Sequence, residues 1–407
     1  MNTNRLQLLP LAVLPLILTA CGGDDSNSQP LSEGSYAVQM VAADYSSSQV
    51  AVGNIIGDRT ATQGLLAESD SGYTLSTFGS TLYHIGQYAI DTISRYDTSA
   101  TTAFNTPVWS YSANDAGDTT ANTYELVQTD DTNAYVIRYG STDVWQVDPA
   151  ATSEENFVKA RIDLSAYNWT GENPSSVPRM VDAIVVNNQL LVLMQRLDSW
   201  WQVQQAYVAV IDLDTNEEVD TDPQTDGLNG IPLTITNPNN LVVNGDTVYV
   251  SGRGDYGSDS GGIDAINTST WAVTNLVNGE TLADELNDAT NNTYYHITDV
   301  AVTDDGQLYL SANIEQGYTT LSSRLYELDL NSNSTEELDL HDLTGIAAET
   351  AIKMGDLNVD SNNRLWAVIR NSDAPGLLVL DTDTNTRSGE LISLDMPASR
   401  ISFLNVE

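Results

Sequence analysis

A pattern of paired strands recurs along this chain, and it constrains the fold more than any other sequence feature. The segment LVVNGDTVYVSGR at residues 241–253 predicts a short apolar strand, a turn of Asn, Gly and Asp, and a second apolar strand. Similar segments lie at residues 74–87, 125–138, 183–196, 300–313 and 357–370. A segment repeated in this way indicates one supersecondary unit that is copied around a larger assembly.

Each unit continues into a second hairpin, as in YVAVIDLDTNEEV at residues 207–219. An Asp or Asn ends the third strand, where its side chain can close the turn by accepting backbone N–H groups. These positions are Asp97, Asp148, Asp212, Asn267, Asp329 and Asp381. We therefore interpret the acidic segment 212–227 as structural, since its spacing does not fit a calcium loop of the EF-hand type, and we predict no metal site. Tyr83, Tyr249 and Tyr309 hold equivalent places in second strands, which predicts a packing repeat.

The last residue of each second strand measures the period. The marker positions are Gln87, Arg138, Arg196, Arg253, Asn313 and Arg370, and they recur 51 to 60 residues apart. Four strands per unit at this period predict an all-β fold, a β-propeller. The six units leave strands at residues 35–68 and 397–407, which together predict a seventh four-stranded blade with the C-terminal strand innermost. We expect one seven-bladed domain over residues 35–407.

The first residues predict export. Arg5 precedes an apolar stretch that is too short to span a bilayer, and residues 18–21 read LTAC. This end is similar to a lipobox, so we expect a signal peptide at residues 1–20, a diacylated Cys21 and a polar tether at residues 21–34. The alternative is an ordinary secretory signal with a chance cysteine. By similarity to other lipoproteins, Gly22 indicates the outer membrane, on its periplasmic or its cell-surface side.

Charge narrows the choice of partners. The chain has 56 acidic against 15 basic residues, a net charge of -41. Nucleic acids and anionic lipid head groups are poor partners for such a surface. We expect a monomer without a cofactor, whose only membrane contact is the lipid anchor.

The few cations are unevenly placed. In a propeller, the loop after the second strand and the start of the innermost strand lie on one face. Arg138, Arg196, Arg253 and Arg370 follow second strands, and Arg179, Lys353 and Arg400 stand at innermost strands. Trp200, Trp201, Tyr256 and His296 are close to them in sequence. Because guanidinium groups bind oxyanions and stack on rings, this pattern predicts a mouth that binds an anionic, ring-bearing molecule. The alternative is that Asp198, Asp255 and Asp373 neutralise the nearby arginines.

Two other functions stay open. His296 with Tyr295 and an arginine could perform β-elimination on a uronate sugar, which would make the chain a polysaccharide lyase or another glycan-active enzyme. The tripeptide Arg253-Gly254-Asp255 and the flat surfaces of a propeller allow a scaffold or an adhesin. No nucleophile elbow, phosphate loop or dinucleotide motif is present, so a binding protein is our first expectation and catalytic residues are unknown.

A family resemblance supports that expectation. The lipobox, the Asp- and Asn-rich tether, the opening SYAVQMVAADYSSSQVAVGNI and the blade segment NNLVVNGDTVYVSGR resemble surface-exposed seven-bladed propeller lipoproteins that act beside TonB-dependent receptors. One branch of these captures ferric siderophores. The resemblance implies a seven-bladed fold from about Ser35 onward, an iron-siderophore as the ligand and an outer-membrane receptor as the partner.

Overall fold

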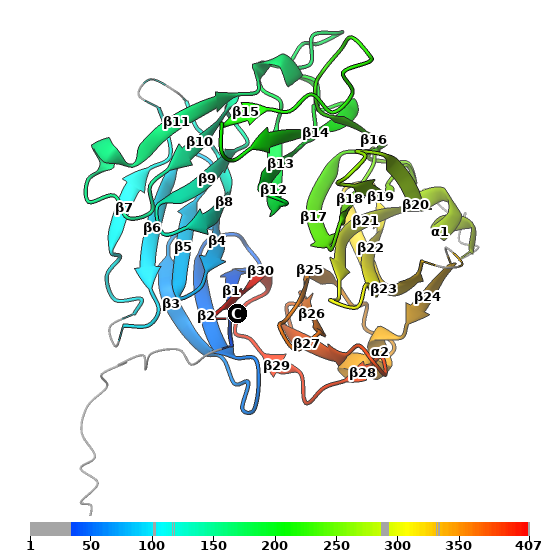
Figure 1. Cartoon of the computed structure of the whole chain (residues 1–407). Coiled ribbons are helices and arrows are strands. Elements are labelled where there is room, and N and C mark those ends of the chain that lie inside the picture. The colour runs from blue at the N-terminus through cyan, green and yellow to red at the C-terminus, as the bar shows by residue number, and fades with distance from the viewer. Residues whose placement is uncertain are drawn as a thin grey trace, which may run out of the picture.

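Seven antiparallel sheets form a closed ring in the computed structural model (Figure 1). The structure describes residues 34–100, 103–115, 117, 119–285, 293–330, 332 and 334–405. The expected signal peptide, Cys21 and nearly all of the tether lie outside these ranges. Among the described residues, no helix is both long and apolar enough to cross a bilayer. The prediction of a seven-bladed, all-β propeller is therefore confirmed.

Blades 1 to 4 are numbered in chain order, innermost strand first. Blade 1 contains β4 (Tyr73–Phe78), β5 (Thr81–Gly86), β6 (Thr92–Asp97) and β7 (Trp109–Ser112). Blade 2 contains β8 (Thr123–Asp130), β9 (Asn133–Arg138), β10 (Asp143–Val147) and β11 (Val158–Asp163). Blade 3 contains β12 (Met180–Val186), β13 (Gln189–Met194), β14 (Gln205–Asp212), β15 (Glu217–Glu218) and β16 (Ile231–Thr236). Blade 4 contains β17 (Pro238–Asn244), β18 (Thr247–Gly252), β19 (Gly262–Asn267) and β20 (Val273–Asn278).

Blades 5 to 7 complete the ring. Blade 5 contains β21 (Thr293–Val302), β22 (Leu308–Gln316), β23 (Thr319–Asp329) and β24 (Ser334–Leu338). Blade 6 contains β25 (Met354–Val359), β26 (Arg364–Ile369), β27 (Gly376–Asp381), β28 (Thr386–Arg387) and β29 (Ile392–Ser393). Blade 7 contains β30 (Ala398–Leu404), β1 (Ser35–Val41), β2 (Ser48–Asn54) and β3 (Thr62–Glu68). Short helices η1 (Glu154–Asn156), η2 (Ser165–Tyr167), α1 (Gly279–Glu285) and α2 (Leu340–Thr344) lie in connections.

The outermost strand of two blades differs from the simple four-strand prediction. In blade 3, β15 and β16 both pair with β14, and in blade 6, β28 and β29 both pair with β27. The fourth strand is thus split into two short pieces. A split outer strand presents a short edge to solvent, which limits edge-to-edge pairing with other chains.

The two ends of the chain close the ring, as predicted. β30 is the innermost strand of blade 7 and pairs with β1, with Ser35 opposite Leu404 and Val38 opposite Ile401. Side chains of β1, such as Tyr36 and Val38, are fully buried beside Trp366 of blade 6. The closure therefore ties the first and last strands into one continuous core.

The turns follow the expected chemistry. Asn187 and Asn188 join β12 to β13 with φ values of 52° and 61°, a left-handed conformation that asparagine tolerates. At the ends of third strands, Asp97 accepts the Ser99 N–H at 3.0 Å and Asn267 accepts the Ser269 N–H at 3.1 Å. The predicted turn-closing role of these side chains is confirmed.

Aromatic side chains in the second strands join neighbouring blades. Tyr83 and Tyr309 are fully buried, and Tyr249 is 7% exposed. The Tyr83 hydroxyl donates to Gln128 of blade 2 at 2.5 Å, and the Tyr309 hydroxyl donates to Asn385 of blade 6 at 2.8 Å. The predicted packing repeat therefore also carries hydrogen bonds from blade to blade.

Candidate functional site

One end of the central channel is ringed by the loops that follow the second strands, and we call this end the mouth. The loops comprise residues 42–47, 87–91, 139–142, 195–204, 253–261, 317–318 and 370–375. All six exposed Tyr and Trp side chains of the described residues lie in these loops. They are Tyr45, Tyr88, Trp200, Trp201, Tyr256 and Tyr318, which are 49% to 89% exposed. Large aromatic side chains are usually buried, so a set of exposed rings that is confined to one end of the propeller indicates a binding surface there.

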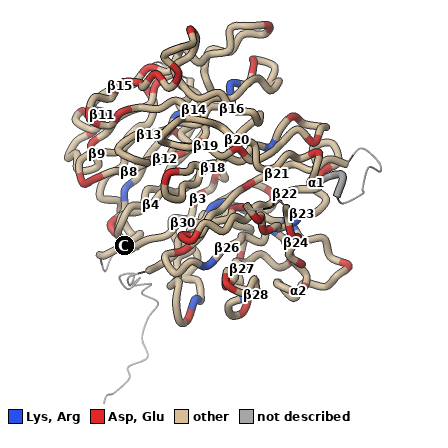
Figure 2. Tube along the Cα trace, turned by 45° about the vertical axis from the view of Figure 1, so that its right-hand side comes forward, with Lys and Arg blue, Asp and Glu red and all other residues tan. Residues whose placement is uncertain are grey.

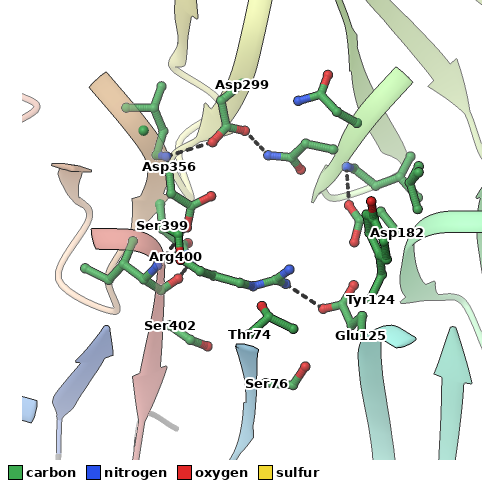
Figure 3. Close-up of a pocket in the computed structure, with 18 of the residues that line it drawn as sticks. Thr74, Ser76, Tyr124, Glu125, Asp182, Asp299, Asp356, Ser399, Arg400 and Ser402 are labelled. Carbon is green, nitrogen blue, oxygen red and sulfur yellow. Dashed lines mark hydrogen bonds and ion pairs between the residues drawn. The ribbon is translucent and has the colours of Figure 1, made fainter. Parts of the chain in front are cut away.

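The channel behind the mouth is a cavity of about 790 Å³ lined by the innermost strands. Six of these strands carry a polar side chain at a β-bulge, a point where the ladder slips by one residue. We call these residues the bulge ring, and most of them appear in Figure 3. The bulge ring consists of Glu125, Asp182, Asn240, Asp299, Asp356 and Arg400.

The bulge ring connects several blades to their neighbours. Asp182 of blade 3 accepts the Leu241 N–H of blade 4 at 2.7 Å. Asp299 of blade 5 accepts the Leu357 N–H of blade 6 at the same distance (Figure 3). A bulge leaves such an N–H group outside the strand ladder, so the neighbouring carboxylate satisfies a donor that would otherwise be unpaired.

The electrostatics of the channel are acidic. Burial raises the pKa of Asp182 and of Asp299 well above the usual range, and a neighbouring carboxylate adds to each shift, Glu125 for the first and Asp356 for the second. Burial opposes the charge of Arg400, but the surrounding carboxylates outweigh it and raise its pKa. Arg400 contacts Glu125 at 2.8 Å (Figure 3). The predicted ligand cation Arg400 is thus engaged in the bulge ring.

Two of the four equivalent arginines depart from the predicted convergence on the mouth. Arg138 is fully buried, donates to the Ala113 carbonyl at 3.1 Å and stacks 4.0 Å from the Trp145 ring. Arg196 is 8% exposed and donates to the carbonyls of Tyr167 and Gln205. These partners lie on outer strands or connections, so both guanidinium groups are directed into the body of the blades. Their buried carbonyl acceptors make them structural in this conformation.

Arg253 is held by the next blade. Its guanidinium forms a short ion pair with Glu315 and lies 4.3 Å from the Tyr256 ring centroid. His296 is fully buried, with Nδ1 at 3.4 Å from Glu315. Burial raises the pKa of Glu315, but the His296 contact and the Arg253 charge outweigh it and lower the value to about 2. The arginine of the Arg253-Gly254-Asp255 tripeptide is therefore engaged within the protein.

Arg179 joins a stack of rings that runs outward from the channel. Its guanidinium carbon lies 3.9 Å from the Trp201 ring centroid and 5.4 Å from that of Tyr139. Tyr139 stacks on Tyr124, which lines the channel, at 4.8 Å. The φ values of Arg179 and Trp201 are 61° and 66°, an uncommon conformation for side chains of this size. Backbone strain of this kind is common at binding sites.

The other two predicted cations, Lys353 and Arg370, lie together at the mouth. Both line a second cavity of about 470 Å³, and Arg370 also lines the channel. Figure 2 shows how sparse such cations are on a chain where acidic positions are spread over every blade. The structure thus brings Arg179, Arg253, Lys353 and Arg370 to the mouth, with Trp200, Trp201 and Tyr256 in its loops.

The alternative of local neutralisation does not hold for the described residues, where no ion pair joins an arginine to Asp198, Asp255 or Asp373. Asp198 is 3% exposed and accepts the N–H groups of Trp200 and Gln202 at 2.8 and 2.9 Å. Its carboxylate therefore shapes the tryptophan loop. Sequence proximity failed as a guide because the side chains of strand-end residues reach across to other segments.

The bulge ring was not predicted, although the sequence carries a signal for it. Glu125, Asp182, Asn240, Asp299 and Asp356 recur 57 to 59 residues apart, at the front of each repeated strand pair. The described residues contain no group of three or more His, Cys, Asp and Glu side chains placed to hold a metal ion. In the acidic segment 212–227, Asp212 accepts the N–H groups of Asp214 and Thr215, both at 3.0 Å.

Solved structures share this architecture at low sequence identity. A protein from Lactobacillus plantarum aligns with a TM-score of 0.59 and 14% identity, over 92% of this chain and all of that one. A provisionally assigned 6-phosphogluconolactonase from Bacteroides fragilis aligns with a TM-score of 0.56 and 12% identity, over 93% of this chain and 99% of that one. These likenesses establish the fold alone. No protein-family model and no curated relative matches the sequence.

Proposed function

We propose that this protein is a binding propeller that holds a small anionic, ring-bearing molecule at its mouth. The observation that carries the proposal is the confinement of all six exposed Tyr and Trp side chains of the described residues to the mouth loops. Arg179, Lys353 and Arg370 lie among them, and within the described chain none of the three is paired with a carboxylate. Guanidinium and ammonium groups beside aromatic faces suit an anion that carries a ring.

The charged groups of the channel indicate how deeply the ligand binds. The bulge ring places four carboxyl groups around one guanidinium, that of Arg400, and Glu125 already engages it, so this cation is not available to an anion at that depth. The ligand therefore stays at the mouth, where it contacts aromatic rings and cations. A ferric siderophore with anionic ring groups is the specific candidate that the family resemblance supplies.

The membrane arrangement belongs to the same proposal. We infer that Cys21 is acylated and anchors the protein to the outer membrane, where a receptor takes over the ligand. The described chain begins at Gly34, whose N–H donates to Asn405 at 2.9 Å at the end of the propeller opposite the mouth. A tether that leaves from this end directs the mouth away from the membrane. Incorporation of labelled palmitate that is lost in Cys21→Ala tests the anchor.

The two alternative functions have less support. His296, the proposed base of a lyase, is fully buried, and the Tyr256 ring packs edge-on against it at 6.0 Å. A substrate cannot reach it in this conformation. For an adhesin, the Arg253 side chain would have to be displayed, yet it is 23% exposed and paired with Glu315. If the protein released unsaturated products that absorb at 235 nm from acidic polysaccharides, the lyase alternative would be supported instead.

Calorimetry and tryptophan fluorescence test the binding proposal. We expect ferric catecholates or other anionic aromatic molecules to bind with a Kd in the micromolar range, about -8 kcal/mol, and to change the emission of Trp200 and Trp201. Trp201→Ala should weaken the binding of a ligand large enough to span the mouth, such as a siderophore, about tenfold. Trp271→Phe, on the opposite side of the propeller, is the matched control and should leave affinity unchanged. Absence of heat and of an emission change across the ligand panel would sink the proposal.

A further inference from the structure

A cavity of about 470 Å³ opens at the mouth between blades 5, 6 and 7, and we call it the side pocket. Within the part of the chain that the structure describes, its charged lining residues are Lys353 and Arg370, and no Asp or Glu lines it. This composition is the reverse of the chain as a whole, in which 56 acidic residues face 15 basic ones. Two cations without a carboxylate in such a chain indicate a place reserved for an anion.

Arg370 differs from the three arginines that hold equivalent positions in other blades. Arg138 and Arg196 donate to backbone carbonyls, and Arg253 is paired with Glu315. Within the described residues, the Arg370 guanidinium has no hydrogen bond and no ion pair, and the same is true of the Lys353 ammonium group. Of the four arginines, the one without a partner among the described residues is therefore the one that lines the side pocket.

The backbone holds the two cations next to each other. The Arg370 N–H donates to the Lys353 carbonyl at 2.7 Å. The Asn371 side chain accepts the Lys353 N–H at 2.9 Å and donates to the Ala351 carbonyl at 2.7 Å. Facing positions on neighbouring strands place their side chains on the same side of the sheet, so the two positive charges repel each other and the arrangement gains stability when an anion lies between them. A frame fixed before binding also lowers the entropy cost of capturing that anion.

Aromatic rings stand on both sides of this frame. Tyr45 comes from the β1–β2 loop of blade 7, and Tyr318 from the tip of the β22–β23 hairpin of blade 5. Both line the side pocket, with 67% and 89% of their surface exposed. The φ of Tyr45 is 59°, a left-handed conformation that is uncommon for a residue of this size. The loops thus hold two rings in water at the edges of a cationic cavity.

We propose that the side pocket binds the oxyanion head group of a small molecule, a phosphate, sulfate or carboxylate, attached to a planar ring. Arg370 accommodates the oxyanion through two N–H donors and Lys353 through one. The attached ring contacts Tyr318 or Tyr45. This inference rests on the proposed function, and it assigns the anion to Lys353 and Arg370 rather than to Arg179 across the mouth. Arg370 lines both cavities, so the head group lies beside the channel and outside the bulge ring.

Calorimetric titration with phenyl phosphate, phenyl sulfate, benzoate and inorganic phosphate tests the assignment and separates the three head groups. We expect Lys353→Gln and Arg370→Gln each to weaken binding of the preferred probe at least tenfold. Because neither side chain has a partner among the described residues, both variants should keep the melting temperature of the wild type. Lys159→Gln and Arg161→Gln, on the outer strand β11, are matched controls and should stay within twofold. Tyr318→Ala should weaken phenyl phosphate but leave inorganic phosphate unchanged.

The outcomes separate this inference from the proposed function. If a probe binds the wild type but binds Lys353→Gln and Arg370→Gln equally well, the side pocket is not the anion site, and the mouth as a whole keeps its proposed function. If Arg179→Gln alone abolishes binding, the anion belongs to the ring stack of blades 2 and 3. If no probe binds the wild type at millimolar concentration, both the inference and the anionic ligand are overturned.

Discussion

Arg400, on the last strand of the chain, contacts Glu125 of blade 2 at 2.8 Å, with blade 1 between them in the ring. The pair spans the channel wall at the point where the ends of the chain close the propeller. Asp356 is another carboxyl group near Arg400. It accepts the Ile401 N–H at 2.8 Å and so connects blade 6 to the same strand. The closure therefore depends on a charge network as well as on strand pairing.

Arg400→Gln should destabilise the protein strongly. The change leaves the carboxylates of the bulge ring without their cation, and because the Arg400 side chain is 33% exposed and that of Glu125 is 13% exposed, we expect a cost of about 1–3 kcal/mol. Urea unfolding followed by near-UV circular dichroism measures the loss. Arg161→Gln removes an exposed ion pair with Asp115 and should cost less than about 1 kcal/mol. Equal effects of the two substitutions would contradict the role assigned to Arg400.

Asp299→Asn should flatten the dependence of stability on pH. Burial and the Asp356 charge raise the pKa of Asp299 in the folded state, so the folded protein binds a proton that the unfolded chain releases above about pH 4. The contribution of Asp299 to the free energy of unfolding is therefore largest at acidic pH and falls as the pH rises. Asparagine keeps an acceptor for the Leu357 N–H and does not titrate. We expect the variant to equal or exceed the wild type in melting temperature at pH 7 and to lose that advantage near pH 4.

Deletion of residues 398–407 should abolish cooperative folding. β30 supplies the innermost strand of blade 7, and its loss exposes the edge of β1, where Tyr36 and Val38 are fully buried. We expect loss of the sigmoidal thermal transition and binding of a hydrophobic dye. Adding a synthetic peptide of residues 398–407 in excess should restore part of the transition. A truncated chain that melts like the wild type would show that the closure is dispensable.

The sequence predicted the architecture because propeller strands repeat locally. The pairing of β30 with β1, between residues 358 to 369 positions apart, followed from counting strands, and the turn role of Asp97 and Asn267 followed from their places at strand ends. The residues that each arginine side chain contacts could not be predicted in this way. Arg138 and Arg253 occupy equivalent positions, yet one turns toward Trp145 of its own blade and the other toward Glu315 of the next. Such choices depend on side chains from other blades, which a repeat pattern does not encode.

Asp198→Ala should loosen the tryptophan loop without unfolding the ring. The carboxylate accepts the N–H groups of Trp200 and Gln202, and its loss leaves these donors without their acceptor, at a cost of about 1–3 kcal/mol to the loop. Hydrogen exchange of residues 198–204 should rise while the exchange of β13 stays unchanged. Asp198→Asn keeps an acceptor oxygen and is the matched control. Unchanged exchange in Asp198→Ala would mean that other contacts hold the loop.

Glu315→Gln should weaken the contact between blades 4 and 5 in a pH-dependent manner. The pKa of Glu315 is lowered to about 2, so the charged carboxylate stabilises the fold above its unfolded pKa, near 4.5, and this contribution is lost as the pH falls toward 2. We expect the variant to be less stable than the wild type at pH 7, by on the order of 2 kcal/mol, because Arg253 loses its charged acceptor. The difference should shrink below pH 4 and vanish near pH 2. A constant difference in the free energy of unfolding across this range would show that Glu315 acts through packing rather than through its charge.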